Sequence, residues 1–107
     1  MSILLSDKSK EFVEKNDISH LLIDITFIEE PCTQIYDPKI EMIKKIDTEK
    51  YENLEKVSGN DITLYLSKQF IEIYGKLKEY QLDVGGFFTK VLILKNIDPI
   101  IKNTCKI

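Results

Sequence analysis

Residues 21–27 read Leu21-Leu22-Ile23-Asp24-Ile25-Thr26-Phe27, and this stretch decides the fold class. Large apolar side chains stand at every second position from Leu21 to Phe27, and Asp24 and Thr26 lie between them. A period of two places alternate side chains on opposite faces of an extended chain. The stretch therefore predicts a β-strand with one face in the core.

Further strands are predicted outward from this one by the same alternation. Residues 61–66 and 79–84 alternate cleanly between apolar and polar side chains. Gly85-Gly86 predicts a tight turn that joins 79–84 to a strand over 87–94. Apolar residues on both faces of 87–94 predict a central strand that is buried on both sides. Residues 35–46 predict a strand in their second half, with a short helix as the alternative.

Two short helices are predicted from capping signals. Ser6 is the expected N-cap of a helix over residues 7–15, and Ser67 caps a helix over 68–74 that Gly75 ends. The charged segment 44–60 predicts a solvated connection from which Tyr51 and Leu54 return to the core. Four or five strands with two short helices predict a mainly β, α+β fold with a mainly antiparallel sheet.

The composition of this chain restricts its function class. A chain of 107 residues with a formal charge of -3 predicts one ordinary domain and gives no support to nucleic-acid binding. The longest apolar run, residues 91–94, is far shorter than the roughly 20 residues of a membrane helix. The first five residues do not form a secretory signal, so a cytoplasmic location is expected. No catalytic constellation is visible, and the prediction is a protein that is not an enzyme.

The two cysteines are the candidate functional residues. The polar, proline-containing stretch 29–34 predicts a loop after the first strand, and Cys32 lies in it. Cys105 lies in residues 96–107, which we predict to be a mobile C-terminal tail. In a reducing compartment, such a pair indicates free thiols, a metal site or a redox pair in preference to a structural disulfide.

The order of these features resembles the HesB-like domain of the A-type iron-sulfur cluster carriers. That family opens with a capped helix like residues 5–9, continues into a strand, and places its first cysteine in the following loop, where this chain has Cys32. Its final cysteine follows a proline by six residues, an interval that Pro99 and Cys105 keep. The chain departs from the family pattern in two places. Pro31 and Thr33 replace the flanking glycines, and Ile107 stands where a further cysteine is usual.

The resemblance implies a HesB-like compact β-sandwich or pseudo-barrel over residues 1–107, and a non-enzymatic role in iron-sulfur cluster assembly or carriage. Cys32 and Cys105 are then the cofactor-binding and metal-binding residues. A cluster usually takes four thiolates, and a twofold homodimer would supply four from two chains. The expected partners are iron-sulfur assembly or acceptor proteins.

Two other readings of the cysteines stay open. The pair can act as a thiol or persulfide redox site if its Cα atoms come within roughly 7 Å. Alternatively, the chain is a degenerate HesB-like fold that serves as a protein-interaction or small-ligand binding module without a cluster. His20 is expected to mark a strand start and is a weaker candidate ligand. Glu29 and Glu30 could add carboxylate oxygens, and Asp24 could face a binding cavity.

Overall fold

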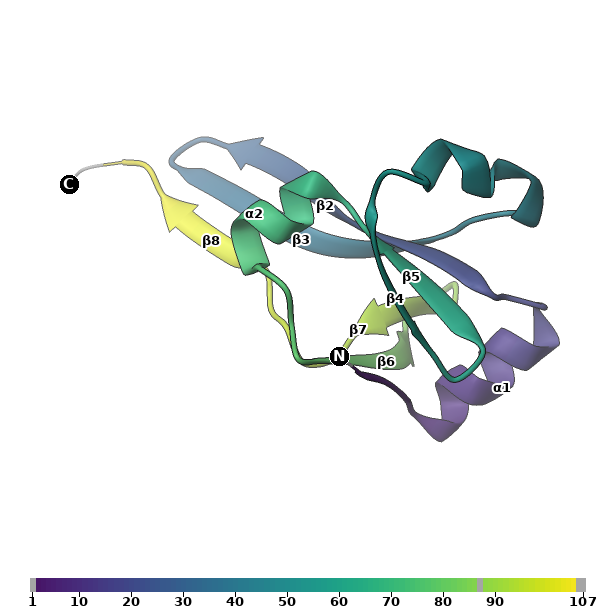
Figure 1. Ribbon diagram of the computed structural model, residues 1–107. Helices are drawn as coiled ribbons and strands as arrows, with labels where there is room; N and C mark the ends of the chain where they lie inside the picture. The colour runs from purple at the N-terminus through teal and green to yellow at the C-terminus, as the bar shows by residue number, and fades with distance from the viewer. Residues whose placement is uncertain (1, 87, 106–107) are drawn as a thin grey trace.

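The computed structural model describes residues 2–86 and 88–105 and shows a mainly β fold with short helices (Figure 1). Phe87, with which one predicted strand begins, lies outside the described residues, as do Lys106 and Ile107 at the end of the predicted tail. The elements follow in the order β1 (Ser2–Leu5), α1 (Asp7–Lys15), β2 (His20–Glu30), β3 (Thr33–Met42), the 3-10 helix η1 (Lys45–Tyr51), β4 (Glu55–Gly59), β5 (Ile62–Leu66), α2 (Lys68–Tyr74), β6 (Glu79–Gly85), β7 (Val91–Leu94) and β8 (Ile100–Asn103).

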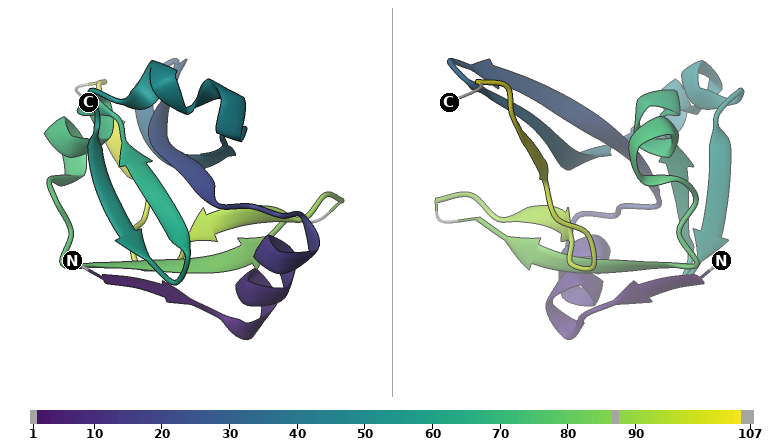
Figure 2. Two further views of the ribbon diagram at one scale, coloured as in Figure 1. Left: turned by 45° about the vertical axis from the view of Figure 1, so that its right-hand side comes forward. Right: turned by 90° about the vertical axis from the view of Figure 1, so that its left-hand side faces the viewer.

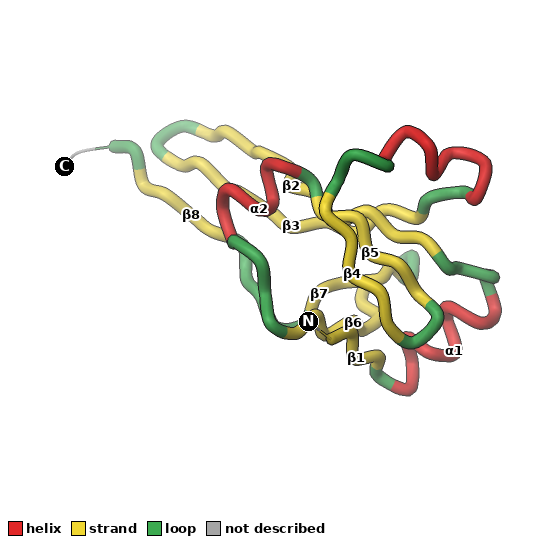
Figure 3. The backbone as a smooth tube through the Cα atoms, in the orientation of Figure 1, coloured by secondary structure: helices red, strands yellow, loops and turns green. Residues whose placement is uncertain are grey.

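The described strands form two curled sheets that enclose one core as a half-barrel (Figure 2). One sheet has the order β1-β6-β7, and the other has the order β4-β5-β2-β3-β8. The pairs β1–β6 and β2–β5 are parallel, and the other four pairs of described strands are antiparallel. Strands dominate the backbone trace in Figure 3, which confirms the predicted mainly β, α+β class.

Both predicted α-helices begin and end as expected. The Ser6 hydroxyl accepts a hydrogen bond from the Ser9 backbone N–H at 3.1 Å, and the Ser67 hydroxyl accepts one from Phe70 N–H at 3.0 Å. These bonds satisfy amide groups that have no partner within the helix. Gly75 follows α2 with a φ of 73°, a conformation that favours glycine.

The strand predicted from residues 21–27 is the centre of the larger sheet. Leu21 and Ile23 are fully buried, and Ile25 is 8% exposed. Phe27, the next residue on this face, is 49% exposed. The apolar row therefore runs from the core out to the surface along one strand.

Three predictions about strands are corrected by the structure. The solvated connection predicted for residues 44–60 contains η1 and β4, and Val57 of β4 is buried. The strand predicted only for the second half of 35–46 covers Thr33–Met42. Pro38 fits inside it because β8 pairs only with residues 33–36, so that, among the described residues, no strand is paired with β3 on its outer side at Pro38.

The third correction concerns the strand predicted over 87–94. It covers only Val91–Leu94 and lies at the edge of its sheet, next to β6. Val91 is 47% exposed and Ile93 is 41% exposed, so one face of β7 meets solvent. Its alternation is that of an edge strand with one buried face, which contains Leu92 and Leu94.

Candidate functional site

Cys32 and Cys105 lie together at the free end of strands β2, β3 and β8. β2 and β3 form a hairpin whose turn is Pro31-Cys32, and Cys32 adopts a φ of 65° there. β8 pairs antiparallel with the start of β3, so that Asn103 lies opposite Thr33. The pairing continues one step further, since Thr104 N–H donates to the Cys32 carbonyl at 2.9 Å. The next residue, Cys105, is thereby brought beside Cys32.

The two cysteines form a disulfide, with their Cα atoms 4.6 Å apart and a separation of 73 positions in sequence. Both residues are exposed, so the sulfur atoms are at the surface of the molecule. The Asn103 side-chain oxygen accepts a hydrogen bond from Cys105 N–H at 3.1 Å and orients the backbone there. Exposure is one of the conditions under which a thiolate can attack a disulfide.

As ligands, the two cysteines are two of the four thiolates that a cluster usually takes. Within residues 2–86 and 88–105, no three His, Cys, Asp or Glu side chains lie close enough to hold a metal ion. The sulfur atoms become ligands only after the disulfide is reduced, because the thiolate is the metal-binding form. A four-thiolate centre built on this pair therefore takes its other ligands from a second chain.

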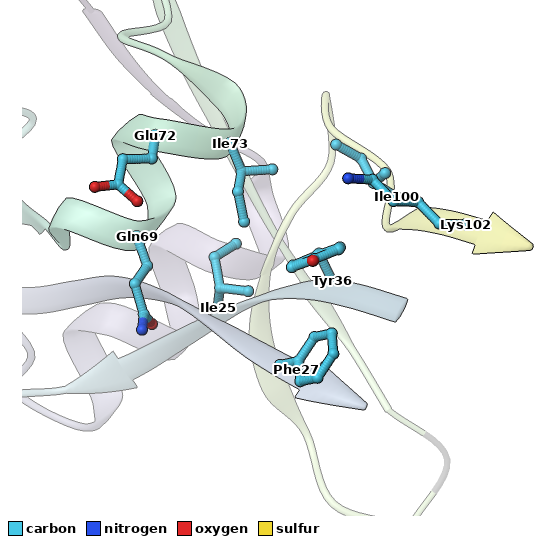
Figure 4. Close-up of a pocket in the computed structure, with 8 residues that line it drawn as sticks. All are labelled: Ile25, Phe27, Tyr36, Gln69, Glu72, Ile73, Ile100 and Lys102. Carbon is cyan, nitrogen blue, oxygen red and sulfur yellow. The ribbon is translucent and has the colours of Figure 1, made fainter. Parts of the chain in front are cut away.

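Next to the disulfide end lies a groove of about 660 Å³ between α2 and strands β2, β3 and β8 (Figure 4). Most of its lining is apolar and comes from the face of the sheet that also carries the core residues. The lining residues are Ile25, Phe27, Tyr36, Gln69, Glu72, Ile73, Ile100 and Lys102. Phe27 and Tyr36 are paired across β2 and β3, and their ring centroids are 5.1 Å apart.

The groove has charged side chains on opposite walls. Glu72 and Gln69 come from α2, and Lys102 comes from β8 (Figure 4). The Lys102 ammonium lies 5.2 Å from the centroid of the Tyr36 ring, which is cation–π distance. This contact holds the lysine over the groove while its charge remains available to a ligand.

Tyr74 connects α2 to the segment that leads into β8. Its hydroxyl donates to the Asp98 carbonyl at 2.6 Å. Burial of the phenol raises the pKa of Tyr74 above its ordinary value, and the nearby Asp37 and Asp98 charges raise it further. The hydrogen bond joins the end of α2 to the segment that precedes β8.

The other residues singled out from the sequence lie elsewhere. His20 begins β2, as predicted, at the end of the strand away from Cys32, and its Nδ1 lies 3.4 Å from the Tyr65 hydroxyl. Asp24 is on the face of β2 opposite the groove row, where its carboxylate accepts the Ile25 N–H. Glu29 accepts a hydrogen bond from Gln34.

The groove was not predicted from the sequence. The alternation over residues 21–27 places Phe27 on the core face of the strand. The sequence does not show that this residue is left 49% exposed at the edge of the groove. No local signal in the sequence marks the groove, because its lining comes from segments that are far apart in the chain.

Comparison with protein-family models, curated proteins and solved structures finds no match to this chain. The resemblance to the HesB-like domain accordingly stays a prediction. Among the described residues, every helix is too short or too polar to cross a membrane.

Proposed function

We propose that this chain is a non-enzymatic thiol–disulfide protein in which Cys32 and Cys105 alternate between a disulfide and a dithiol. The observation that carries the proposal is the convergence of two exposed cysteines 73 residues apart at one end of the molecule. A cytoplasmic location belongs to this proposal, since a reducing compartment can return the pair to the dithiol.

Reduction of the pair takes two electrons and two protons from a partner dithiol, and a partner disulfide reoxidises the pair by the same steps in reverse. A partner thiolate attacks one sulfur of the pair, a mixed disulfide forms, and the other cysteine leaves as a thiolate that takes a proton from water. The second thiol of the partner then displaces the protein sulfur. The partner ends as a disulfide, and Cys32 and Cys105 end as two thiols.

The test is a redox titration of the native chain in dithiothreitol or glutathione buffers, followed by alkylation of free thiols and mass spectrometry. We expect Cys32 and Cys105 to be alkylated together in one two-electron step at a potential above about −300 mV, because structural disulfides typically lie below that value. Cys32→Ser is the control, and its remaining thiol should be alkylated throughout. A native pair still oxidised near −300 mV would show that the bond is only structural.

A second candidate function is that of an iron-sulfur cluster assembly or carrier-like accessory protein, as the HesB-like resemblance implies. The observation that favours it is the position of the two exposed cysteines at the turn end of strands β2, β3 and β8, where a second subunit can approach. In a twofold homodimer the reduced pair of each chain would supply two of four thiolates. Its partners would be assembly or acceptor proteins for the cluster.

Anaerobic reconstitution of the reduced chain with ferrous iron and sulfide tests this candidate. The expected result is visible absorption with about half a cluster per chain, lost in both Cys32→Ser and Cys105→Ser. Sedimentation of the reconstituted sample should give a dimer. Reduced native chain that retains no iron after desalting would eliminate the cluster function and leave the thiol–disulfide proposal untouched.

A further inference from the structure

We propose that the groove between α2 and β8 is the docking site for the thiol substrate of the Cys32–Cys105 disulfide. The substrate class is an extended peptide segment with one large apolar side chain, an acidic residue beside it, and a free cysteine a few residues away. This inference rests on the thiol–disulfide function proposed above, and it adds the means by which a partner is selected.

The first argument is the apolar surface that the fold leaves open. Ile25 closes the core side of the groove and is 8% exposed, whereas Phe27 on the same strand is 49% exposed. Tyr36 and Ile73 pack against the core, and with Ile100 they complete the apolar lining. Ligand sites in proteins typically measure roughly 300–1,000 Å³, and this groove has a volume of about 660 Å³. It has room for one large side chain and its neighbours.

The second argument is charge. Lys102 on the β8 wall lies nearer in sequence to the disulfide than any other lining residue of that strand. None of the ion pairs among the described residues uses Lys102 or Glu72. An acidic substrate residue can therefore pair with Lys102, while Glu72 on the α2 wall disfavours a second acid on that side. The groove thus distinguishes the two directions of a bound segment.

The third argument is the distance from the groove to the sulfur atoms. Residues 33–35 of β3 lie between Tyr36 and the turn, so Cys32 is four positions from Tyr36. Lys102 is three positions from Cys105. At about 3.3 Å per residue, both routes span roughly 10–13 Å. The cysteine of an extended substrate should therefore lie three or four positions along the chain from its docked side chain.

The chemical step is the first half of the exchange described above. The substrate thiolate forms a bond to one sulfur of the pair, the Cys32–Cys105 bond breaks, and the released cysteine leaves as a thiolate. No other oxidant or reductant is needed for this step. Docking accelerates it by holding the attacking sulfur near the bond, which raises its effective concentration.

The experiment measures this step with two defined peptides, acetyl-Asp-Phe-Gly-Gly-Cys-amide and acetyl-Asp-Ser-Gly-Gly-Cys-amide. Their thiols have the same neighbours, so a difference in rate reports docking of the aromatic side chain. Each is mixed at low concentration with the oxidised chain, the reaction is quenched with acid, and the mixed disulfide is counted by mass spectrometry. We expect the phenylalanine peptide to react about tenfold faster with the native chain.

Variants locate the effect in the groove. Phe27→Ser should bring the two peptides to within about twofold of one another. Lys102→Glu should slow the phenylalanine peptide, because the new carboxylate repels the aspartate of the peptide. Ile46→Ser is the matched control because Ile46 is 86% exposed on η1, away from the groove, and it should keep the native ratio. Thermal unfolding of each oxidised variant confirms that it is folded.

Equal rates for the two peptides with the native chain would overturn the docking inference, and so would a tenfold ratio that survives in Phe27→Ser. Reaction with dithiothreitol, run beside each assay, separates this failure from failure of the proposed function. If dithiothreitol reduces the disulfide readily but the two peptides react at equal rates, only the docking inference is wrong. If neither dithiothreitol nor the peptides reduce the disulfide, the proposed thiol–disulfide function is wrong as well.

Discussion

The Ser6 side chain caps α1 and also joins this helix to β6. Its hydroxyl accepts the Ser9 N–H as the N-cap of α1, and it donates to the Asp83 carboxylate at 2.7 Å. The backbone N–H of Val84 donates to the same carboxylate oxygen at 2.8 Å. The Ser6 hydrogen bond, and after it that of Val84, lowers the pKa of Asp83 because both bonds favour the charged form. Ser6 is recognisable as a cap from sequence, whereas its partner 77 residues away is not.

Asp83→Asn should lower the free energy of unfolding at pH 7 and have less effect at acid pH. The folded-state pKa of Asp83 lies below its unfolded value of about 3.9, so the stabilisation is present above that pH and is lost as the pH falls through the folded pKa. Urea unfolding at pH 7 and at pH 3 measures both values. Glu30→Gln removes the same charge from an exposed side chain outside this network and is the control. An equal loss at the two pH values would contradict the assignment.

At the scale of the element, β8 depends on contacts outside its own sequence. It lies at the edge of the five-stranded sheet and pairs with residues 33–36 of β3 along one side. Beyond its last residue, the Thr104 hydrogen bond and the disulfide fasten the chain to the β2–β3 turn. A four-residue edge strand held on one side has few interactions of its own. The disulfide is therefore the main restraint on the β8 wall of the groove.

Reduction of the disulfide should loosen β8 without unfolding the core. We expect amide exchange at Thr104 and Lys102 to accelerate by about tenfold or more in Cys105→Ser, because that restraint is lost. Leu64 in the centre of β5 is fully buried and serves as the internal control, with unchanged exchange after correction for global stability. Hydrogen exchange followed by NMR gives both rates in one sample. If the Thr104 amide exchanges as slowly in the variant as in the native chain, the β3–β8 pairing holds β8 in place without the disulfide.

Across the whole molecule, the two sheets share one core. Tyr80 and Leu82 of β6 belong to the same buried cluster as Leu21 and Ile23 of β2. Phe70 of α2 is fully buried in that cluster as well. Gly59 in β4 lies close to Ile3 of β1, so the edges of the two sheets are also in contact. Neither sheet can keep its apolar face out of water without the other, which predicts a single cooperative unit.

Phe70→Ala should lower the free energy of unfolding by about 3–5 kcal/mol because it leaves a cavity in this shared core. Urea unfolding followed by far-UV circular dichroism and by tyrosine fluorescence should give coincident transitions in the native chain and in the variant. Ile46→Ala, at a residue that is 86% exposed, should change the value by less than about 0.5 kcal/mol. Two separated transitions would show that the sheets unfold independently.

Prediction from sequence succeeded where a short segment carries its own signal. The alternation of residues 61–66 predicted β5, and Ser67 with Gly75 predicted both ends of α2. It failed at β4, whose five residues contain one buried apolar side chain, Val57, among polar neighbours. It also failed at β1, which becomes a strand by pairing with β6. The cysteines were identified as the candidate site, and a redox pair that can form a reversible disulfide was one of the alternatives left open for them.

The sequence by itself determined the fold class, the two capped helices, the central strand and the two candidate cysteines. These features depend on periodicity and on hydrogen bonds between residues that are close in the chain. Only the tertiary structure decided the pairing of β8 with β3, the convergence of Cys32 with Cys105, and the groove beside them. Each of these joins segments that are far apart in sequence. The free energy that holds them comes from packing and pairing in the assembled sheets, which no local pattern encodes.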